Sequence, residues 1–247
     1  MTTKENSTKQ RLSRRNYLVG LGIAYLLLWT ALAFSPLDRG DWLLENLLAV
    51  VAVVVLTTTY RWFPLSRASY SLIFIFMCLH SIGAHYTYAE VPYDRWFANL
   101  TGTSLNSLLG WERNHFDRAV HFCYGVLLAY PAREVFLRIA DARGFWGYFL
   151  PLDLMMSTSM LFELIEWRIT KLVGGDLGMA YLGTQGDIWD AHKDMALASL
   201  GALIAMVLTV IVTATVKKDF AREWGESLRV KQAEPLGEVA LEHMLRK

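Results

Sequence analysis

Charged residues and cysteines are scarce in this sequence. Only 19% of its 247 residues are charged, and the formal net charge of +1 gives no indication of a nucleic-acid partner. The two cysteines, Cys78 and Cys123, both fall in apolar segments, where we expect buried thiols rather than a disulfide. The glycine-rich stretch 174–186 lacks the Gly-Lys-Ser/Thr ending of a phosphate-binding loop, which argues against nucleotide binding.

Hydrophobic residues make up 54% of the chain and come in long runs that match the roughly 30 Å hydrocarbon core of a bilayer. The sequence therefore predicts an all-α, polytopic membrane protein with about six transmembrane helices. The expected spans are approximately 16–35, 43–60, 69–88, 118–137, 146–167 and 191–215. They divide the chain into a basic tail at 1–15, a transmembrane domain at 16–215 and a polar tail at 216–247.

The distribution of basic residues predicts the orientation. With the amino terminus in the cytoplasm, the segments on that side carry all but seven of the 24 Lys and Arg residues. The seven on the other side are Arg39, Arg95, Arg113, Arg118, Arg168, Lys171 and Lys193. The positive-inside rule then places both termini in the cytoplasm of a protein located in the inner (plasma) membrane.

Acidic and histidine residues gather at the exoplasmic ends of three expected spans. An ionised carboxylate at membrane depth costs several kcal/mol unless it is paired, protonated or bound to a cation, so a convergent set indicates a common site. The residues are Asp117, His121, Glu163, Glu166, Asp187, Asp190, His192 and Asp194. His80 and His85, at the end of another span, are more typical of interhelical hydrogen bonds.

Within each of the three expected spans, the spacing of these polar residues places them on one face of the helix. Asp117 and His121 are four residues apart, and Glu163 and Glu166 are three apart. The spacing of Asp187, Asp190 and Asp194 continues to Gly201, where a small residue allows close helix approach. The polar faces thus indicate a lined cavity. The aromatic segment 89–117 is expected to lie in the head-group region, placed to form a lid.

Carboxylates and imidazoles supplied by several helices are the ligands of Mg, Mn, Zn or non-haem iron sites. A bound divalent metal lowers the pKa of its water and makes it a nucleophile. This reasoning predicts a metal-assisted enzyme that acts on a lipid or lipid-linked substrate. The candidate catalytic residues are Asp117, His121, Glu163 and Glu166, and the candidate metal ligands are Asp117, His121, Glu166, Asp187, Asp190 and Asp194.

Two alternatives use the same residues. A proton-coupled transporter would use the acids as a relay, which Glu134 and Asp153 would have to continue toward the cytoplasm. A non-catalytic envelope or lipid-binding protein would only pair them with neighbouring bases, which are Arg113, Arg118, Arg168 and Lys193. Membrane lipids are expected partners in every case, and protein partners are left open.

Three stretches resemble the bacterial inner-membrane family typified by YjdF. They are Asn114 to His121, Glu163 to Trp167 and Gly183 to Asp194, and the resemblance extends over about residues 10–215. It implies a multi-pass inner-membrane protein with no assigned activity.

A weaker resemblance, over 114–201, is to VanZ-like membrane proteins with their Asp-Lys-x-x-His, Glu-x-x-Gln and Asp-x-x-x-Asn pattern. In this chain Glu166 and Asp194 stand where that pattern has Gln and Asn, which increases the need for a cation.

Overall fold

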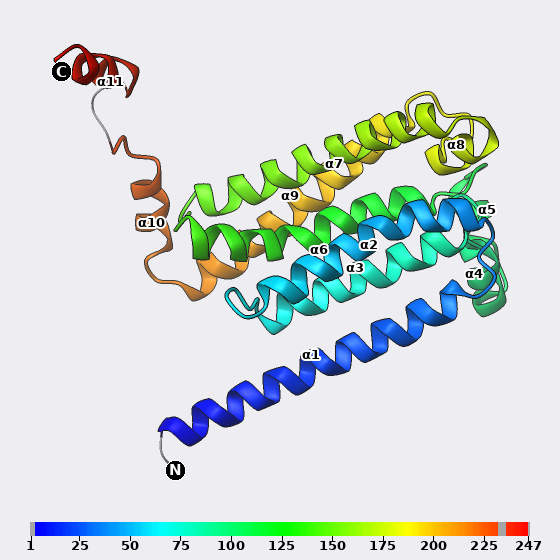
Figure 1. Ribbon diagram of the computed structural model, residues 1–247, viewed down its shortest axis with the longest axis horizontal. Helices are drawn as coiled ribbons and strands as arrows, with labels where there is room; N and C mark the ends of the chain where they lie inside the picture. The colour runs from blue at the N-terminus through cyan, green and yellow to red at the C-terminus, as the bar shows by residue number, and fades with distance from the viewer. Residues whose placement is uncertain (1–2, 232–235, 247) are drawn as a thin grey trace.

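The computed structural model is entirely helical over the residues that it describes, 3–231 and 236–246. The long helices are α1 (Thr3–Ala33), α2 (Arg39–Thr59), α3 (Arg67–His85), α6 (Phe116–Ile139), α7 (Trp146–Val173) and α9 (Asp190–Val216). The short helices are α4 (Tyr93–Thr101), α5 (Leu105–Leu109), α8 (Gly175–Leu182), α10 (Phe220–Ser227) and α11 (Leu236–Leu245). The long helices run along one axis, with α4, α5 and α8 at one end and both termini at the other (Figure 1).

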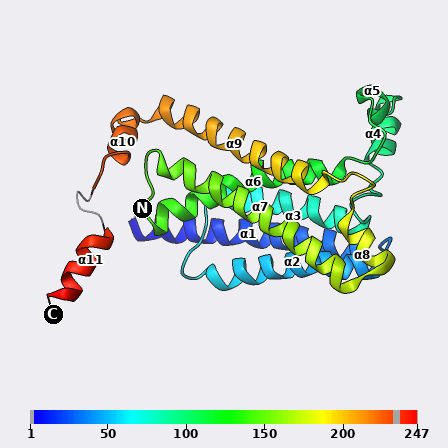
Figure 2. The same cartoon turned by 90° about the horizontal axis from the view of Figure 1, so that it is seen from above.

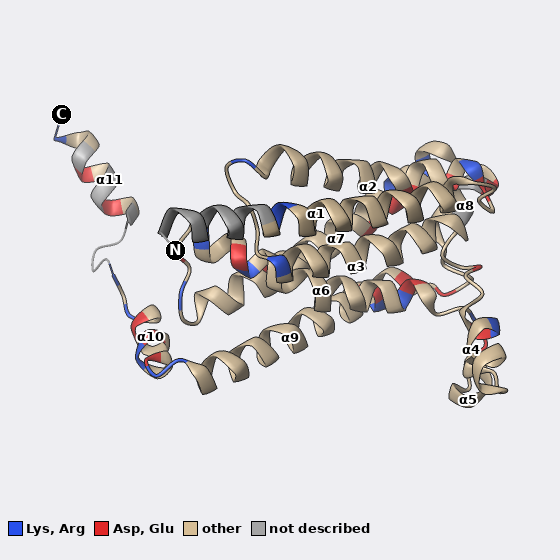
Figure 3. Ribbon diagram, turned by 90° about the horizontal axis from the view of Figure 1, so that it is seen from below, with Lys and Arg blue, Asp and Glu red and all other residues tan. Residues whose placement is uncertain are grey.

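Five of these helices are long and apolar enough to cross a membrane: α1 from Ser13, α2, α3, α7 and α9. The membrane class expected from composition is therefore confirmed. Helix α6, with 24 residues, matches the remaining expected span in position but is not among the five. Charged residues gather at the two ends of the bundle, and the middle of the long helices is mostly uncharged (Figure 3).

The interior of the bundle holds polar and small residues together with a few large apolar ones such as Met206, and many large apolar residues lie outside. Asp41, Asn46 and His80 are buried, whereas Leu26 and Leu208 are more than half exposed, at 60% and 56%. This arrangement suits a lipid solvent, in which large apolar side chains are stable on the surface and helices associate through small residues and hydrogen bonds.

Helix α6 lies at the centre and packs against α3, α7 and α9. Its closest neighbour is α9, because glycines on both helices let the backbones approach. A Cβ added to Gly125 would overlap the carbonyl oxygen of Ala198, and one added to Gly201 would overlap that of Phe122. The close approach expected at Gly201 is thus confirmed.

Both tails contain helical segments among the described residues. Helix α1 begins at Thr3, so the basic segment 1–15 is from that residue the first part of a long helix; its Lys, Glu, Gln and Arg residues are good helix formers. In the tail after 216, α10 packs Phe220 and Trp224 against Tyr148 of α7. The polar tail therefore begins with a helix that docks on the bundle.

We predict that Gly201→Ala destabilises the bundle by about 1–3 kcal/mol, the usual cost of overpacking. The added methyl group would meet the backbone of Phe122 and lie 3.0 Å from the amide nitrogen of Val126. The measurement is the midpoint of thermal unfolding in detergent. Gly22→Ala in α1 is the control, because a Cβ there has no neighbour within 4 Å; equal midpoints for the two variants would contradict the packing account.

Candidate functional site

The candidate residues lie at the end of the bundle that carries α8. Asp117 and His121 are in the first two turns of α6, Glu163 and Glu166 are near the end of α7, and Asp190 and Asp194 begin α9. These helices pack against one another, so their polar ends meet at one depth. Helix α2 adds Asp41 and Glu45 at its start.

Asp117, His121 and Asp194 form the tightest group. One ligand atom from each lies within 4.8 Å of the others. Metal–oxygen bonds of about 2.0–2.6 Å place any two ligands of one ion within about 5 Å of each other, and the group meets this limit. We call these three residues the triad. The geometry can hold a divalent cation between α6 and α9.

Glu163 stands next to the triad. Its Oε1 atom lies 3.5 Å from Nε2 of His121, which is also 3.6 Å from Oδ1 of Asp117. Glu163 is 8% exposed and Asp194 only 2%, and among the described residues Oε1 of Glu163 and Oδ1 of Asp194 have no hydrogen-bond partner. Two buried carboxylate oxygens are thus free to accept a ligand or a proton.

Asp187 and Asp190, also candidate ligands, are paired with arginines. Arg113 Nη1 and Arg118 Nη2 lie 2.8 and 3.0 Å from Oδ1 of Asp190. Arg118 also pairs with Asp187, whose other partners are Lys193 at 2.6 Å and Arg113 at 3.6 Å. The hydrogen bonds from Lys193 and from the backbone amide of Trp189 hold the pKa of Asp187 well below its usual range.

Arg113, Arg118 and Lys193 are thus paired with Asp187 and Asp190. Interfacial pairing therefore describes Asp187 and Asp190, whereas Asp117, Glu163 and Asp194 have no ion pair with Lys or Arg among the described residues. His192, next to Asp190, is exposed and packs edge-on against Trp189, at 5.2 Å between ring centroids.

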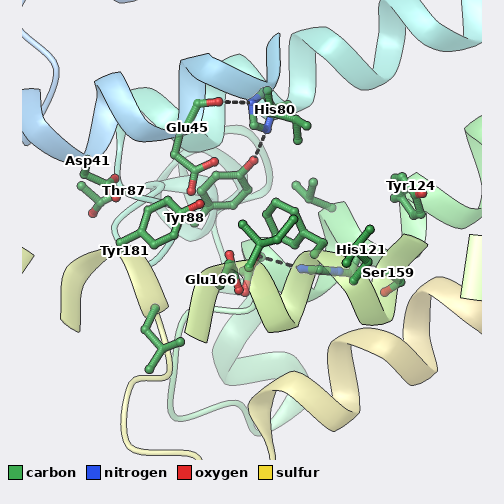
Figure 4. A pocket seen from close by; sticks show the side chains of 18 of the residues that line it. Asp41, Glu45, His80, Thr87, Tyr88, His121, Tyr124, Ser159, Glu166 and Tyr181 are labelled. Carbon is green, nitrogen blue, oxygen red and sulfur yellow. Dashed lines mark hydrogen bonds and ion pairs between the residues drawn. The ribbon is translucent and has the colours of Figure 1, made fainter. Parts of the chain in front are cut away.

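A cavity of about 340 Å³ adjoins the triad. Its polar lining includes the carboxyl groups of Asp41, Glu45, Asp117 and Glu166 and the rings of His80, His121, Tyr88 and Tyr181. Figure 4 shows that the labelled side chains of this lining converge from α2, α3, α6, α7 and α8 and from the turn after α3. The cavity is large enough for the head group of a lipid or another small ligand.

His80 is already satisfied and is a poor ligand candidate. Its Nδ1 lies 2.5 Å from the hydroxyl of Tyr88, and its Nε2 lies 3.1 Å from the carbonyl oxygen of Glu45 (Figure 4). Tyr88 fits because residue 83 is glycine: a Cβ there would lie 2.6 Å from the ring carbon Cζ. His85 likewise contacts the carbonyl oxygen of Leu32 at 2.7 Å.

The cavity opens sideways, toward the lipid. Leu48 of α2 and Leu161 and Ile165 of α7 line it, and the same three residues are 45%, 53% and 44% exposed on the outer surface. Because these three side chains belong both to the cavity wall and to the outer surface, they form the rim of the cavity opening. The rim lies between α2 and α7, on the apolar outer surface of the bundle.

The expectation that segment 89–117 forms a lid over the site is wrong for its two helices. That segment forms α4 and α5, which project from the end of the bundle (Figure 2), and no residue of these two helices lines the cavity. Tyr181, Leu182 and Gly183, from α8 and its C-terminal cap, line it instead.

Asp41, Tyr88 and Tyr181 are the site residues that sequence reasoning missed. Asp41 and Glu45 are four residues apart, the same spacing as Asp117 and His121, and this signal was present in the sequence. The phenols of Tyr88 and Tyr181 belong to the site because α8 and the turn after α3 fold over it, which no local pattern indicates.

Comparison with known proteins agrees with this architecture. The family model described as "Predicted membrane protein (DUF2238)" matches residues 17–215. The inner membrane protein YjdF of Escherichia coli (strain K12) is 35% identical over 188 residues, which cover 76% of this chain and 85% of that protein. No solved structure matches the chain. The resemblance to YjdF noted in the sequence is confirmed, and the chain belongs to the DUF2238 family of membrane proteins.

Proposed function

We propose that this protein is a metal-assisted hydrolase that acts on a lipid or lipid-linked substrate. The observation that carries the proposal is the triad: Asp117, His121 and Asp194 present three ligand atoms within 4.8 Å of one another, beside a cavity that opens toward the lipid. The metal is a divalent cation of the Mg, Mn, Zn or Fe class, since these accept mixed carboxylate and imidazole ligands.

Charge supports a cation at the triad. Asp117, Glu163 and Asp194 lie together, while Arg113 and Arg118 are occupied by Asp187 and Asp190. Buried carboxylates without a counter-charge disfavour their own ionisation, so either protons or a metal must be bound. Two oxygens without partners, on Glu163 and Asp194, favour a ligand that accepts electron pairs.

Each residue has a chemical role in this proposal. The triad would hold the metal, and the bound metal would lower the pKa of a water toward neutrality. Glu163 is the general base, because its Oε1 lies 3.5 Å from Nε2 of His121 and has no hydrogen-bond partner among the described residues. Glu166 lines the cavity and contacts the substrate, while Asp187 and Asp190 hold the ends of α6 and α9 together through their arginines.

Two observations count against a proton relay through the membrane. Glu134 is occupied at the opposite end of the bundle, where it accepts hydrogen bonds from Ser69 Oγ at 2.6 Å and from Arg138 at 2.9 Å. Asp153 is exposed on α7. The two acids that would have to continue the relay toward the cytoplasm are thus placed elsewhere.

The proposed setting is the inner membrane, with α6 as a sixth span and both termini in the cytoplasm. The relative from Escherichia coli is named an inner membrane protein. Arg14, Arg67, Arg133 and Arg138 lie in the first half of α1, at the start of α3 and in the last part of α6. Figure 3 shows basic residues at the end of the bundle with both termini, in keeping with the positive-inside rule. The site then lies at the exoplasmic face.

The topology predicts the behaviour of reporter fusions. An alkaline phosphatase reporter, active only outside the cytoplasm, stays inactive after Lys247 and becomes active when inserted at Gly102, at the C-terminal end of α4. A cytoplasmic green fluorescent protein at the same two positions gives the opposite pattern. An active phosphatase after Lys247 would overturn both the orientation and the exoplasmic site.

The chemistry predicts that two substitutions separate metal binding from catalysis. Asp194→Asn loses both the metal and turnover, because it removes a triad ligand. Glu163→Gln keeps the metal but slows turnover by about 10²–10⁴-fold, the usual contribution of a general base. The measurements are elemental analysis of the purified protein and mass spectrometry of lipid products in nanodiscs made from bacterial lipid extract.

Asp153→Asn, an exposed acid on the same helix as Glu163, is the matched control and retains both properties. Wild-type protein that is folded and free of metal would refute the triad. Metal-loaded protein that binds lipid without producing any product would refute the hydrolase and favour the non-catalytic lipid-binding alternative.

A further inference from the structure

We propose that the part of the cavity formed by Asp41, Glu45 and Glu166 with Tyr88 and Tyr181 binds the primary ammonium group of an aminophospholipid head group. We call this part the ammonium pocket. The inference rests on the proposed function, since it names the substrate class of the same cavity, but the ammonium pocket uses none of the triad residues.

Asp41 is the first reason to assign a ligand here. It lies in the first turn of α2, lines the cavity and is only 1% exposed. Neither of its carboxylate oxygens has a hydrogen-bond partner among the described residues. A buried carboxyl group without partners is costly, and it is placed on the wall of an accessible cavity. A cation in the cavity removes that cost.

The two phenols support the same conclusion. Tyr88 and Tyr181 lie outside the long helices, and burial raises the pKa of each phenol well above its usual range. The negative charges of Glu45, Glu166 and Asp41 add to this effect in both tyrosines. The three carboxyl groups and the two phenols line the same cavity, and Figure 4 shows Glu45 directed toward the phenols.

This composition matches an ammonium group. An ammonium has three N–H donors, and three carboxyl groups are available to accept them, while tyrosine rings attract cations through their faces. No Lys or Arg lines the cavity, so the ammonium pocket has nothing to attract an isolated phosphate or sulfate.

The lipid source of the ammonium follows from the rim. Leu48, Leu161 and Ile165 connect the cavity to the lipid-facing surface, so a phospholipid can insert its head group while its acyl chains stay in the bilayer. A soluble amine would gain nothing from this apolar rim. The ligand class is thus a lipid with a primary amine, such as phosphatidylethanolamine.

The test is native mass spectrometry of the full-length protein in detergent with dioleoylphosphatidylethanolamine. The matched probes are its N-acetyl derivative, which keeps the tails and phosphate but loses the positive charge, and dioleoylphosphatidylglycerol. We expect the amine lipid to bind about 30-fold more tightly than either, the usual effect of a buried charge pair. Equal binding by wild-type protein would overturn the proposal.

Variants locate the preference. Asp41→Asn is isosteric and breaks no hydrogen bond of that side chain. The double variant Asp41→Asn/Glu45→Gln should abolish the preference for the amine lipid, and Asp153→Asn should retain it. A preference that persists in the double variant contradicts the assignment. Free ethanolamine at equal concentration should not displace the lipid; displacement would assign the ammonium pocket to a soluble amine and overturn the lipid source.

The failure of this inference is distinguishable from the failure of the metal site. The measurement is repeated with EDTA and with Asp194→Asn, and the amine preference should survive both. Loss of the preference in either case would mean that the lipid is held by the metal, which would overturn the ammonium pocket. If the wild-type protein contains no metal but still prefers the amine lipid, only the proposal that the triad binds a metal would be refuted.

Discussion

The backbone contact between α6 and α9 is the constraint on which the site depends. Gly125 and Gly201 allow this contact, and each lies on the same helix as a triad residue. His121 precedes Gly125 by four residues and Asp194 precedes Gly201 by seven, so glycine and ligand share a face on each helix. The close approach of the backbones therefore brings Asp194 to His121 and Asp117. A wider helix pair would separate the ligands beyond the reach of one ion.

The second constraint is the charge that this contact concentrates at membrane depth. Arg113 and Arg118 neutralise Asp187 and Asp190, which ties the loop before α9 to the start of α6. The triad and the ammonium pocket receive no such partner among the described residues. The cavity that contains the ammonium pocket and adjoins the triad has an apolar rim and a polar interior, so under the proposed function a bound cation and a lipid head group would complete the site together. Stability and ligand binding are thus coupled at this end of the bundle.

The sequence predicted the helices and the polar end well because both depend on local patterns. Apolar runs predict where the long helices lie in the sequence, and spacings such as that of Asp117 and His121 predict which helix faces are polar. The side-chain partners and the lining of the cavity depend on which helices pack against one another, which local patterns do not indicate. Pairing of the candidate acids with neighbouring bases was only one alternative from the sequence; the pairing of Asp190 with Arg113, 77 residues away, and the covering of the cavity by Tyr181 arise from tertiary contacts. The role of Asp41 was missed because it precedes the apolar run and resembles an ordinary helix-start acid.

The central claim, that α6 and α9 hold one divalent cation, is tested most directly by pulsed electron paramagnetic resonance of the protein loaded with Mn²⁺. The account predicts modulation from one imidazole nitrogen in the wild-type protein. That modulation disappears in His121→Ala and persists in His80→Ala, because His80 is occupied by Tyr88 and Glu45. A folded wild-type protein that shows only the spectrum of hydrated Mn²⁺, without nitrogen coupling, would contradict the claim.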